Sequence, residues 1–151
     1  MFLPLVLLFF AQTGQKQETS ASFLLHRSAL RGETGAIEML LKLGADPNAR
    51  DNQGKTALYD AALKNHLDTA RLLIDRGAKI DVRDENGATP LHDAALGGSV
   101  KVIELLLNRK AEINPRDSDG NTPLDYALKM DRSDAVRILQ AAGAEKGKKT
   151  K

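Results

Sequence analysis

The repeating unit of this chain is clearest in the stretch Asp84-Glu85-Asn86-Gly87-Ala88-Thr89-Pro90-Leu91-His92-Asp93-Ala94-Ala95. Its counterpart 33 residues earlier is Asp51-Asn52-Gln53-Gly54-Lys55-Thr56-Ala57-Leu58-Tyr59-Asp60-Ala61-Ala62. Its counterpart 33 residues later is Asp117-Ser118-Asp119-Gly120-Asn121-Thr122-Pro123-Leu124-Asp125-Tyr126-Ala127-Leu128. A fixed period of this length is typical of a solenoid, in which each unit buries its apolar face only against its neighbours. The sequence therefore predicts a row of similar stacked units.

The shared pattern Gly-x-Thr-Pro-Leu-His-x-Ala-Ala resembles the ankyrin repeat, and the resemblance covers roughly residues 22–144. It implies an all-α repeat fold, an ankyrin α-solenoid of stacked helix-turn-helix units with β-hairpin finger loops. We therefore expect a repeat domain over residues 21–144, with repeats at about 21–50, 51–83, 84–116 and 117–144. Repeat one lacks the turn signature, as expected of an end unit in a self-capped array.

Each interior repeat carries start and stop signals for a short first helix. A threonine stands before that helix, where its oxygen can accept hydrogen bonds from free backbone N–H groups, at Thr56, Thr89 and Thr122. We expect the first helices to end in left-handed residues, at Gly32, Asn65, Gly98 and Asp131. The second helices should end in the same way, at Gly44, Gly77, Lys110 and Gly143. Lys110 is the exception among these glycines and should be strained.

Three positions of the second helices carry further predictions. One should form a constant buried column, Leu40, Leu73, Leu106 and Leu139. At the next position Gln140 replaces the apolar residues of the earlier repeats, which suits a last repeat whose outer side meets water. A third position alternates in charge and predicts a ladder of opposite charges along the outer helices, Glu38, Arg71, Glu104 and Arg137.

Composition narrows the class of protein. One hundred and fifty-one residues suit a single domain, and 42% apolar with 28% charged residues is ordinary for a soluble globular protein. Because the chain has no cysteine, it has no disulfide, no thiol nucleophile and no thiolate metal site. Four lysines and one glutamate give residues 145–151 a charge of +3, so a net charge of +2 leaves the rest near neutral. We expect a basic disordered tail and no nucleic-acid binding.

The N-terminal residues resemble a secretory signal. An apolar run over residues 1–11 is too short to cross a bilayer, which takes roughly 20 residues, and polar residues follow it. No lysine or arginine precedes the run, and no clean Ala-x-Ala site follows, so the best cleavage candidates are Ala11, Thr13 and Gly14. We expect residues 1–20 to be a signal peptide and polar linker, and the protein to be exported to a periplasm or secreted. The alternatives are an uncleaved anchor, or a mis-chosen start codon with a cytoplasmic protein.

Sequence motifs give little support to catalysis. Residues 49–56 match a relaxed P-loop ending in Gly54-Lys55-Thr56, but no strand-like segment precedes them. His26, His66 and His92 lie in separate units without metal-ligand spacing. No Ser-His-Asp or Gly-x-Ser-x-Gly context is present. We therefore expect no enzymatic activity, no cofactor and no metal.

The resemblance implies a protein-binding module that acts as a monomer, through its concave finger and short-helix surface. The positions it implies are Arg50, Asn52, Gln53, Lys55, Lys64, Arg83, Glu85, Asn86, Ala88, Arg116, Ser118, Asp119, Asn121, Lys129 and Met130. Each finger arginine precedes an aspartate, so Arg-Asp pairs should line the fingers; we expect the aspartates to accept turn N–H groups and the arginines to contact a partner. The alternatives are a nucleotide-binding protein that uses the Gly54-Lys55-Thr56 turn, and a structural repeat cap with no isolated partner.

Overall fold

The computed structural model describes residues 20–148. In that range the chain forms eight helices, and no β-strand is assigned. The helices form four consecutive pairs: α2 (Ser20–Arg31) with α3 (Thr34–Lys42), α4 (Ala57–Leu63) with α5 (Leu67–Asp75), α6 (Pro90–Gly97) with α7 (Val100–Asn108), and α8 (Pro123–Lys129) with α9 (Ser133–Ala141). The expected signal peptide falls on residues 1–19, which lie outside the described residues.

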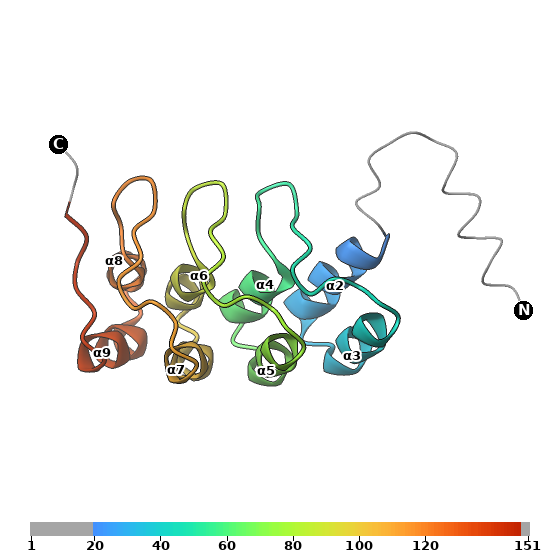
Figure 1. Ribbon diagram of the computed structural model, residues 1–151. Helices are drawn as coiled ribbons and strands as arrows, with labels where there is room; N and C mark the ends of the chain where they lie inside the picture. Colours follow the sequence, from blue (N-terminus) through green and yellow to red (C-terminus); the bar gives the residue numbers. More distant parts are fainter. Residues whose placement is uncertain (1–19, 149–151) are drawn as a thin grey trace, which may run out of the picture.

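The four pairs stack side by side in one row (Figure 1). The first helices α2, α4, α6 and α8 form one layer, and the second helices α3, α5, α7 and α9 form the other. Each helix packs against its own partner and against the equivalent helix of the neighbouring pair. Three finger loops, residues 43–56, 76–89 and 109–122, project on the side of the first helices. The predicted all-α solenoid is confirmed, whereas the expected β-hairpins are turns and loops with no assigned strand among residues 20–148.

The first helices of repeats two to four begin after the three predicted threonines, and two of these helix starts carry a reciprocal cap. The Thr89 N–H donates to His92 Nδ1 at 3.0 Å, and the Thr122 N–H donates to the Asp125 carboxylate at 2.9 Å, so both helices begin with a reciprocal cap. Tyr59 takes the place of this acceptor in the second repeat. As a result the Thr56 hydroxyl is buried without a hydrogen-bond partner among residues 20–148.

All eight predicted left-handed residues have positive φ. Five of them are glycines, and their φ values lie between 69° and 98°: Gly32, Gly44, Gly77, Gly98 and Gly143. The non-glycine members are Asn65, Lys110 and Asp131, with φ of 58°, 67° and 53°. Lys110 is the only one whose side chain cannot mimic a backbone turn, so it carries the strain that its position predicts.

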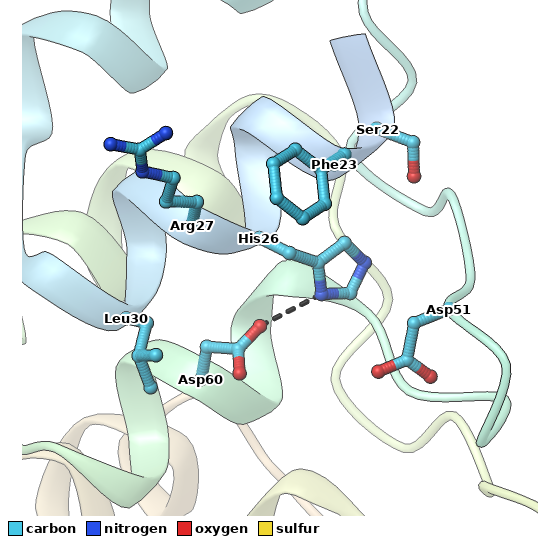
Figure 2. A pocket seen from close by; sticks show the side chains of 7 residues that line it. All are labelled: Ser22, Phe23, His26, Arg27, Leu30, Asp51 and Asp60. Carbon is cyan, nitrogen blue, oxygen red and sulfur yellow. Dashed lines mark hydrogen bonds and ion pairs between the residues drawn. The ribbon is translucent and has the colours of Figure 1, made fainter. Parts of the chain in front are cut away.

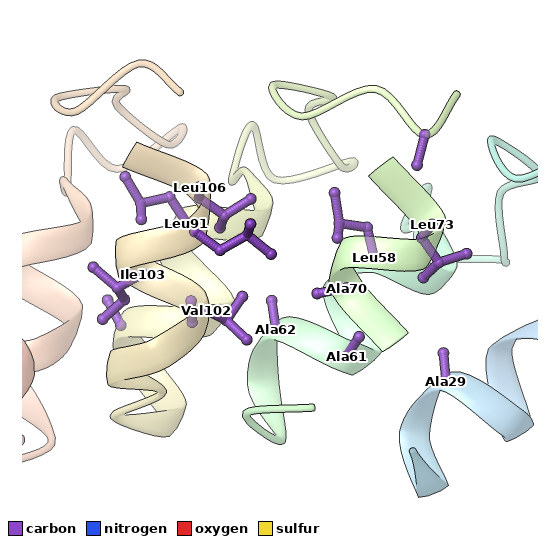
Figure 3. Packing of buried hydrophobic residues seen from close by; sticks show 14 of the residues in the cluster. Ala29, Leu58, Ala61, Ala62, Ala70, Leu73, Leu91, Val102, Ile103 and Leu106 are labelled. Carbon is purple, nitrogen blue, oxygen red and sulfur yellow. The ribbon is translucent and has the colours of Figure 1, made fainter. Parts of the chain in front are cut away.

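The core is a continuous layer between the two rows of helices (Figure 3). Small residues let neighbouring first helices approach closely, and the pairs Ser28-Ala29, Ala61-Ala62 and Ala94-Ala95 are all buried. Three members of the predicted leucine column are fully buried, Leu73, Leu106 and Leu139. The fourth, Leu40, is partly exposed, so the prediction of a constant column is wrong at that end of the described stack.

Each finger is shaped by one aspartate. The Asp51 carboxylate accepts the N–H groups of Gln53 at 2.8 Å and Lys55 at 2.9 Å. Asp84 and Asp117 accept equivalent pairs of N–H groups in the next two fingers. Neighbouring fingers are joined by backbone bonds, from Glu85 N–H to the Gln53 carbonyl at 3.0 Å and from Ser118 N–H to the Asn86 carbonyl at 2.8 Å. The predicted structural role of the aspartates is confirmed.

The finger arginines differ from the expectation. Arg50 donates to the backbone carbonyl of Arg83 at 3.0 Å, and Arg83 donates to that of Arg116 at 2.8 Å. Each also reaches back to a glycine carbonyl of its own finger, Gly54 or Gly87. Within residues 20–148 no ion pair joins a finger arginine to the aspartate that follows it. The expected Arg-Asp pairs are therefore absent there, because the guanidinium groups are used to tie one finger to the next.

The outer charges also pair differently from the predicted ladder. Arg76 reaches Glu38 of the preceding repeat at 3.3 Å, and Arg109 reaches Asp75 of its preceding repeat at 2.9 Å. Among the described residues, Arg71 and Glu104 take part in no ion pair. The prediction of a ladder along one position is wrong, because the cation that crosses between repeats comes from the end of the second helix.

Residues 145–148, the described part of the expected disordered tail, follow a defined path along repeat four. The Glu145 N–H donates to Asn114 at 2.8 Å, and its carbonyl accepts the Thr122 hydroxyl at 2.8 Å. The Gly147 N–H donates to the Asp125 carboxylate at 2.6 Å. A Cβ at Gly147 would lie 2.0 Å from the Gly120 carbonyl oxygen, so only glycine fits this approach. Residues 145–148 therefore lie against repeat four in the place that the start of a next finger would take.

Candidate functional site

The finger loops and the first helices α2, α4, α6 and α8 together form one surface, which we call the finger face (Figure 1). Most of the predicted binding residues fall on it in three groups. The first group lies at the finger tips, Asn52, Gln53, Glu85, Asn86, Ser118 and Asp119, all exposed. The second lies at the finger bases, Arg50, Arg83 and Arg116. The third lies at the C-terminal ends of α4 and α8, Lys64, Lys129 and Met130.

The structure brings the tip residues together and separates the helix-end residues from them. Backbone bonds between adjacent fingers hold the tips in one row. Lys64 is the residue after α4 and Met130 the residue after α8, at the far end of each helix from its finger. Ala88 is buried, with 3% of its surface exposed, so it presents no side chain for contact. Lys55 and Asn121 are half-buried.

The turn that resembles a P-loop has its polar groups occupied. Lys55 Nζ lies 2.7 Å from the Asp93 carboxylate and 5.5 Å from the centre of the Tyr59 ring. The N–H groups of Gln53 and Lys55 are bound by Asp51, and that of Gly54 by the Asp51 carbonyl. Burial raises the pKa of the Asp93 carboxyl, while the bond from Lys55 opposes that rise. These groups stabilise the stack rather than leaving a phosphate cradle.

A pocket of about 380 Å³ opens on the finger face at repeat one (Figure 2). Helices α2 and α4 and the first finger line it, through Ser22, Phe23, His26, Arg27, Leu30, Asp51 and Asp60. Phe23 is 60% exposed and Leu30 is 42% exposed, so the pocket has an apolar wall open to solvent. Figure 2 shows Phe23 beside His26, with Asp60 and Asp51 on the opposite sides of the imidazole ring.

His26 joins the two repeats that form this pocket. Its Nδ1 lies 2.8 Å from the Asp60 carboxylate, and its Nε2 lies 3.2 Å from the Ala49 carbonyl oxygen. Burial lowers the pKa of His26, but the hydrogen bond and charge of Asp60 and the Ala49 carbonyl together raise it above its ordinary value. With an acceptor facing each nitrogen, both ring N–H groups donate. The ring therefore favours the protonated imidazolium.

His92, at the same repeat position, has the opposite character. Its Nδ1 accepts the Thr89 N–H, and its Nε2 lies 3.1 Å from the Asn121 carbonyl oxygen, to which it donates. Burial lowers the pKa of His92 and outweighs the carbonyl that raises it. The ring is therefore a neutral structural group. The difference arises because Thr89 is the N-cap of α6, where its backbone N–H is free to donate to the ring, whereas Phe23 lies inside α2.

Sequence reasoning missed the pocket. Apart from Arg50, its predicted positions all came from repeats two to four, because repeat one lacks the turn signature on which they were aligned. Part of the signal was present at Phe23, which replaces the threonine of the other repeats. Leu30 is the leucine that repeats two and three also carry, at Leu63 and Leu96, but it is more exposed than they are. Together the two residues place large apolar side chains at the repeat-one end of the finger face.

Two further properties bear on the class of protein. Among residues 20–148 no group of three or more histidine, aspartate or glutamate side chains is arranged to hold a metal ion. None of the helices in the same range has the length and apolar content needed to cross a membrane.

Comparison with known proteins gives two matches. A family model described as ankyrin repeats (3 copies) matches residues 3–84 and 77–150, nearly the whole chain. Protein HOS4 of Saccharomyces cerevisiae is 44% identical over 48 residues. That match covers 32% of this chain and 4% of the yeast protein, so it concerns a short piece of a far longer molecule.

Proposed function

Because the chain belongs to the ankyrin repeat family, whose repeats generally mediate protein–protein interaction, we propose that it binds a partner protein through its finger face. The observation that carries the proposal is the pocket at repeat one. Exposed Phe23 and Leu30 form an apolar wall at the repeat-one end of the finger face, where polar residues surround them. Apolar side chains gathered at a concavity and rimmed by polar groups are typical of interaction sites.

The pocket has the composition of an interface anchor. Its apolar wall would receive an apolar side chain of the partner, while Arg27, Asp51 and the His26–Asp60 pair supply a polar rim. A minority of contacts dominates most interfaces, and such contacts are usually aromatic or lie in well-packed pockets. We therefore assign the main binding energy to Phe23 and Leu30, and a supporting role to the polar finger tips.

The arginines have a different place in this proposal from the one the sequence suggested. Arg50 and Arg83 each donate a hydrogen bond from one guanidinium nitrogen to a backbone carbonyl of the next finger. Each has further donors, because a guanidinium carries five N–H groups in a fixed fork. Their main role in this proposal is to hold the finger row together, and their remaining N–H donors are available to a partner.

The nucleotide-binding alternative has less support. The lysine and the N–H groups that would hold a phosphate are bound to Asp93 and Asp51. Ankyrin repeats are also generally non-enzymatic. Lack of saturable ATP binding by the purified chain would end this alternative.

Affinity capture with matched variants tests the proposal. Tagged wild-type chain is used beside a Phe23→Ala/Leu30→Ala double variant and a Glu104→Ala control, with captured proteins identified by mass spectrometry. Glu104 is exposed on α7, in the layer away from the fingers, and joins no ion pair among residues 20–148. We expect at least one protein to be retained by wild type and control and lost by the double variant. No such protein would favour the structural-cap alternative.

A further inference from the structure

The apolar residues on the surface are concentrated in repeat one. Of the six large exposed apolar side chains among the described residues, five belong to it, and the sixth is Met130. Phe23 and Leu30 line the pocket on the finger face. The others are Leu24, Met39 and Leu43, which are 41%, 65% and 75% exposed. With Ala36, these three make up what we call the N-terminal end face.

In later repeats the same positions are covered by the preceding repeat. The equivalents of Leu24 are all buried, Ala57, Pro90 and Pro123. The equivalents of Ala36, itself exposed, are all buried as well, Thr69, Val102 and Ala135. The equivalents of Met39 are buried or half-buried, Leu72, Leu105 and Ile138. The end face therefore has the chemistry of a surface between repeats rather than that of a solvated cap.

Leu43 gives the clearest sign of what should cover this face. Its equivalents are Arg76, Arg109 and Ala142, and each of the two arginines forms an ion pair with an acid of the preceding repeat, Glu38 or Asp75. The position thus reaches backwards across the boundary between repeats. In repeat one the cation is replaced by leucine, so the group that it meets should be apolar.

The chain carries an apolar segment in the matching register. Residues 3–11 lie 33 positions before residues 36–44, the second helix of repeat one and its left-handed end. The counterparts of Glu38 and Asp75, the acids that meet the arginines, are Leu5 and Phe9, both apolar. Leu8 matches Leu41, Ile74 and Leu107, which another repeat covers, whereas the last repeat has exposed Gln140 there. The family match also begins at residue 3.

The length of the connecting chain permits the contact. Residues 12–19 separate this segment from the start of α2. Eight residues can span up to about 26 Å. Equivalent helices of neighbouring units pack at roughly 8–10 Å, so the segment can reach the end face. A second copy fits less well, because the opposite end of the stack offers Gln140 and the charged Asp134–Arg137 pair.

We propose that residues 3–11 cover the N-terminal end face of repeat one, in the register of the second helix of a preceding half-repeat. Leu8 then faces Ala36 and Met39, and Leu5 and Phe9 meet Leu43. Val6 is the counterpart of Met39 and faces away from repeat one. The proposal competes with the expectation that the same residues are a cleaved export signal.

Matched variants two residues apart test the register. The full chain is produced without secretion, and its intact mass confirms that residue 1 or 2 begins it. Leu8→Glu should lower the thermal midpoint by at least ~3 °C, because it places a charge against the end face. Val6→Glu, in the same apolar run, should leave the midpoint unchanged. Equal effects of the two, or a larger effect of Val6→Glu, would overturn the proposal.

Met39→Glu closes a double-mutant cycle with Leu8→Glu. If the two side chains are in contact, Met39→Glu lowers the midpoint in the wild-type chain and has little further effect in the Leu8→Glu chain. Strictly additive effects would contradict the contact.

Hydrogen exchange gives a readout that needs no variant. The amides of residues 3–11 should be protected in the wild-type chain, and exchange at the rate of an unstructured peptide would overturn the proposal.

The rival occupants give distinguishable results. Sedimentation should show a monomer at all concentrations, whereas a concentration-dependent dimer that Met39→Glu abolishes would assign the face to a second copy. Recovery of the chain from its own cells with its N-terminus between residues 12 and 15 would show that the segment is removed. Either result contradicts the proposal, and neither alters the test of partner binding at Phe23 and Leu30.

Discussion

The guanidinium of Arg50 donates to the backbone carbonyl of Arg83, the residue that stands at the same place one repeat later, at 3.0 Å. Arg83 repeats the contact with Arg116 at 2.8 Å. A side chain that the sequence presents as a free surface charge therefore joins consecutive fingers. These arginines hold neighbouring fingers to one another, and the aspartate-bound turns hold the shape of each single finger.

The first prediction follows from this contact. Arg83→Ala removes the bonds to the Gly87 and Arg116 carbonyls and should reduce the free energy of unfolding by about 1–2 kcal/mol. The ion pair with Glu112 is exposed on both sides and adds little. Glu85→Ala, at the exposed tip of the same finger, is the control and should change stability by less than about 0.5 kcal/mol. Equal results in urea unfolding would mean that Arg83 does not join the fingers.

The second prediction concerns the buried Thr56 hydroxyl. Thr56→Val removes a polar atom that has no partner among the described residues, so stability should stay level or rise by up to about 1 kcal/mol. Thr89→Val removes a hydroxyl that lies 3.1 Å from His92 Nδ1 at a helix start, and should cost about 1 kcal/mol. Thermal unfolding of the two variants checks the contrast. A larger loss for Thr56→Val than for Thr89→Val would refute it.

The third prediction concerns backbone strain at Lys110, whose φ is 67°. Relief of roughly 1–2 kcal/mol of left-handed strain by Lys110→Gly is partly offset by the greater freedom of glycine in the unfolded chain. The net result should be a rise in thermal midpoint of about 2–4 °C. Asn108→Gly, inside the end of α7, should lower the midpoint instead. An unchanged or lower midpoint for Lys110→Gly would rule out the strain.

The fourth prediction concerns pH. The folded pKa of His26 lies above the unfolded value, so its protonation stabilises the fold at pH below about 6.5, and this contribution is lost as pH rises through the folded pKa. The stability gap between wild type and His26→Gln should therefore be largest near pH 5.5 and shrink towards pH 9. Urea unfolding at several pH values measures this gap. A gap that is constant or grows with pH would show that His26 is not charged in the fold.

The sequence predicted those features of the fold that depend on local chemistry. Helix ends followed from glycine, asparagine and aspartate at fixed positions, because left-handed backbone is open to few residue types. The role of Asp51 followed from the ability of a short carboxylate to bind nearby turn N–H groups.

Contacts between repeats were not predictable in the same way. Arg76 pairs with Glu38, and Arg109 pairs with Asp75. The choice of these partners depends on how far a long side chain reaches across the boundary between two repeats. The pocket was missed for a related reason. Its walls come from α2, α4 and a finger, and only the stacked arrangement brings Phe23 near Asp51 and Asp60.

The most direct test of the protein-binding account is the dissociation constant of the captured partner for purified Phe23→Ala, measured beside wild type and Glu104→Ala. Phe23 is 60% exposed, so its replacement should leave the thermal midpoint close to that of wild type. The account predicts that Phe23→Ala weakens binding at least about 10-fold, while Glu104→Ala binds as wild type does. Unchanged affinity for Phe23→Ala, or an equal loss for Glu104→Ala, would contradict binding at the finger face.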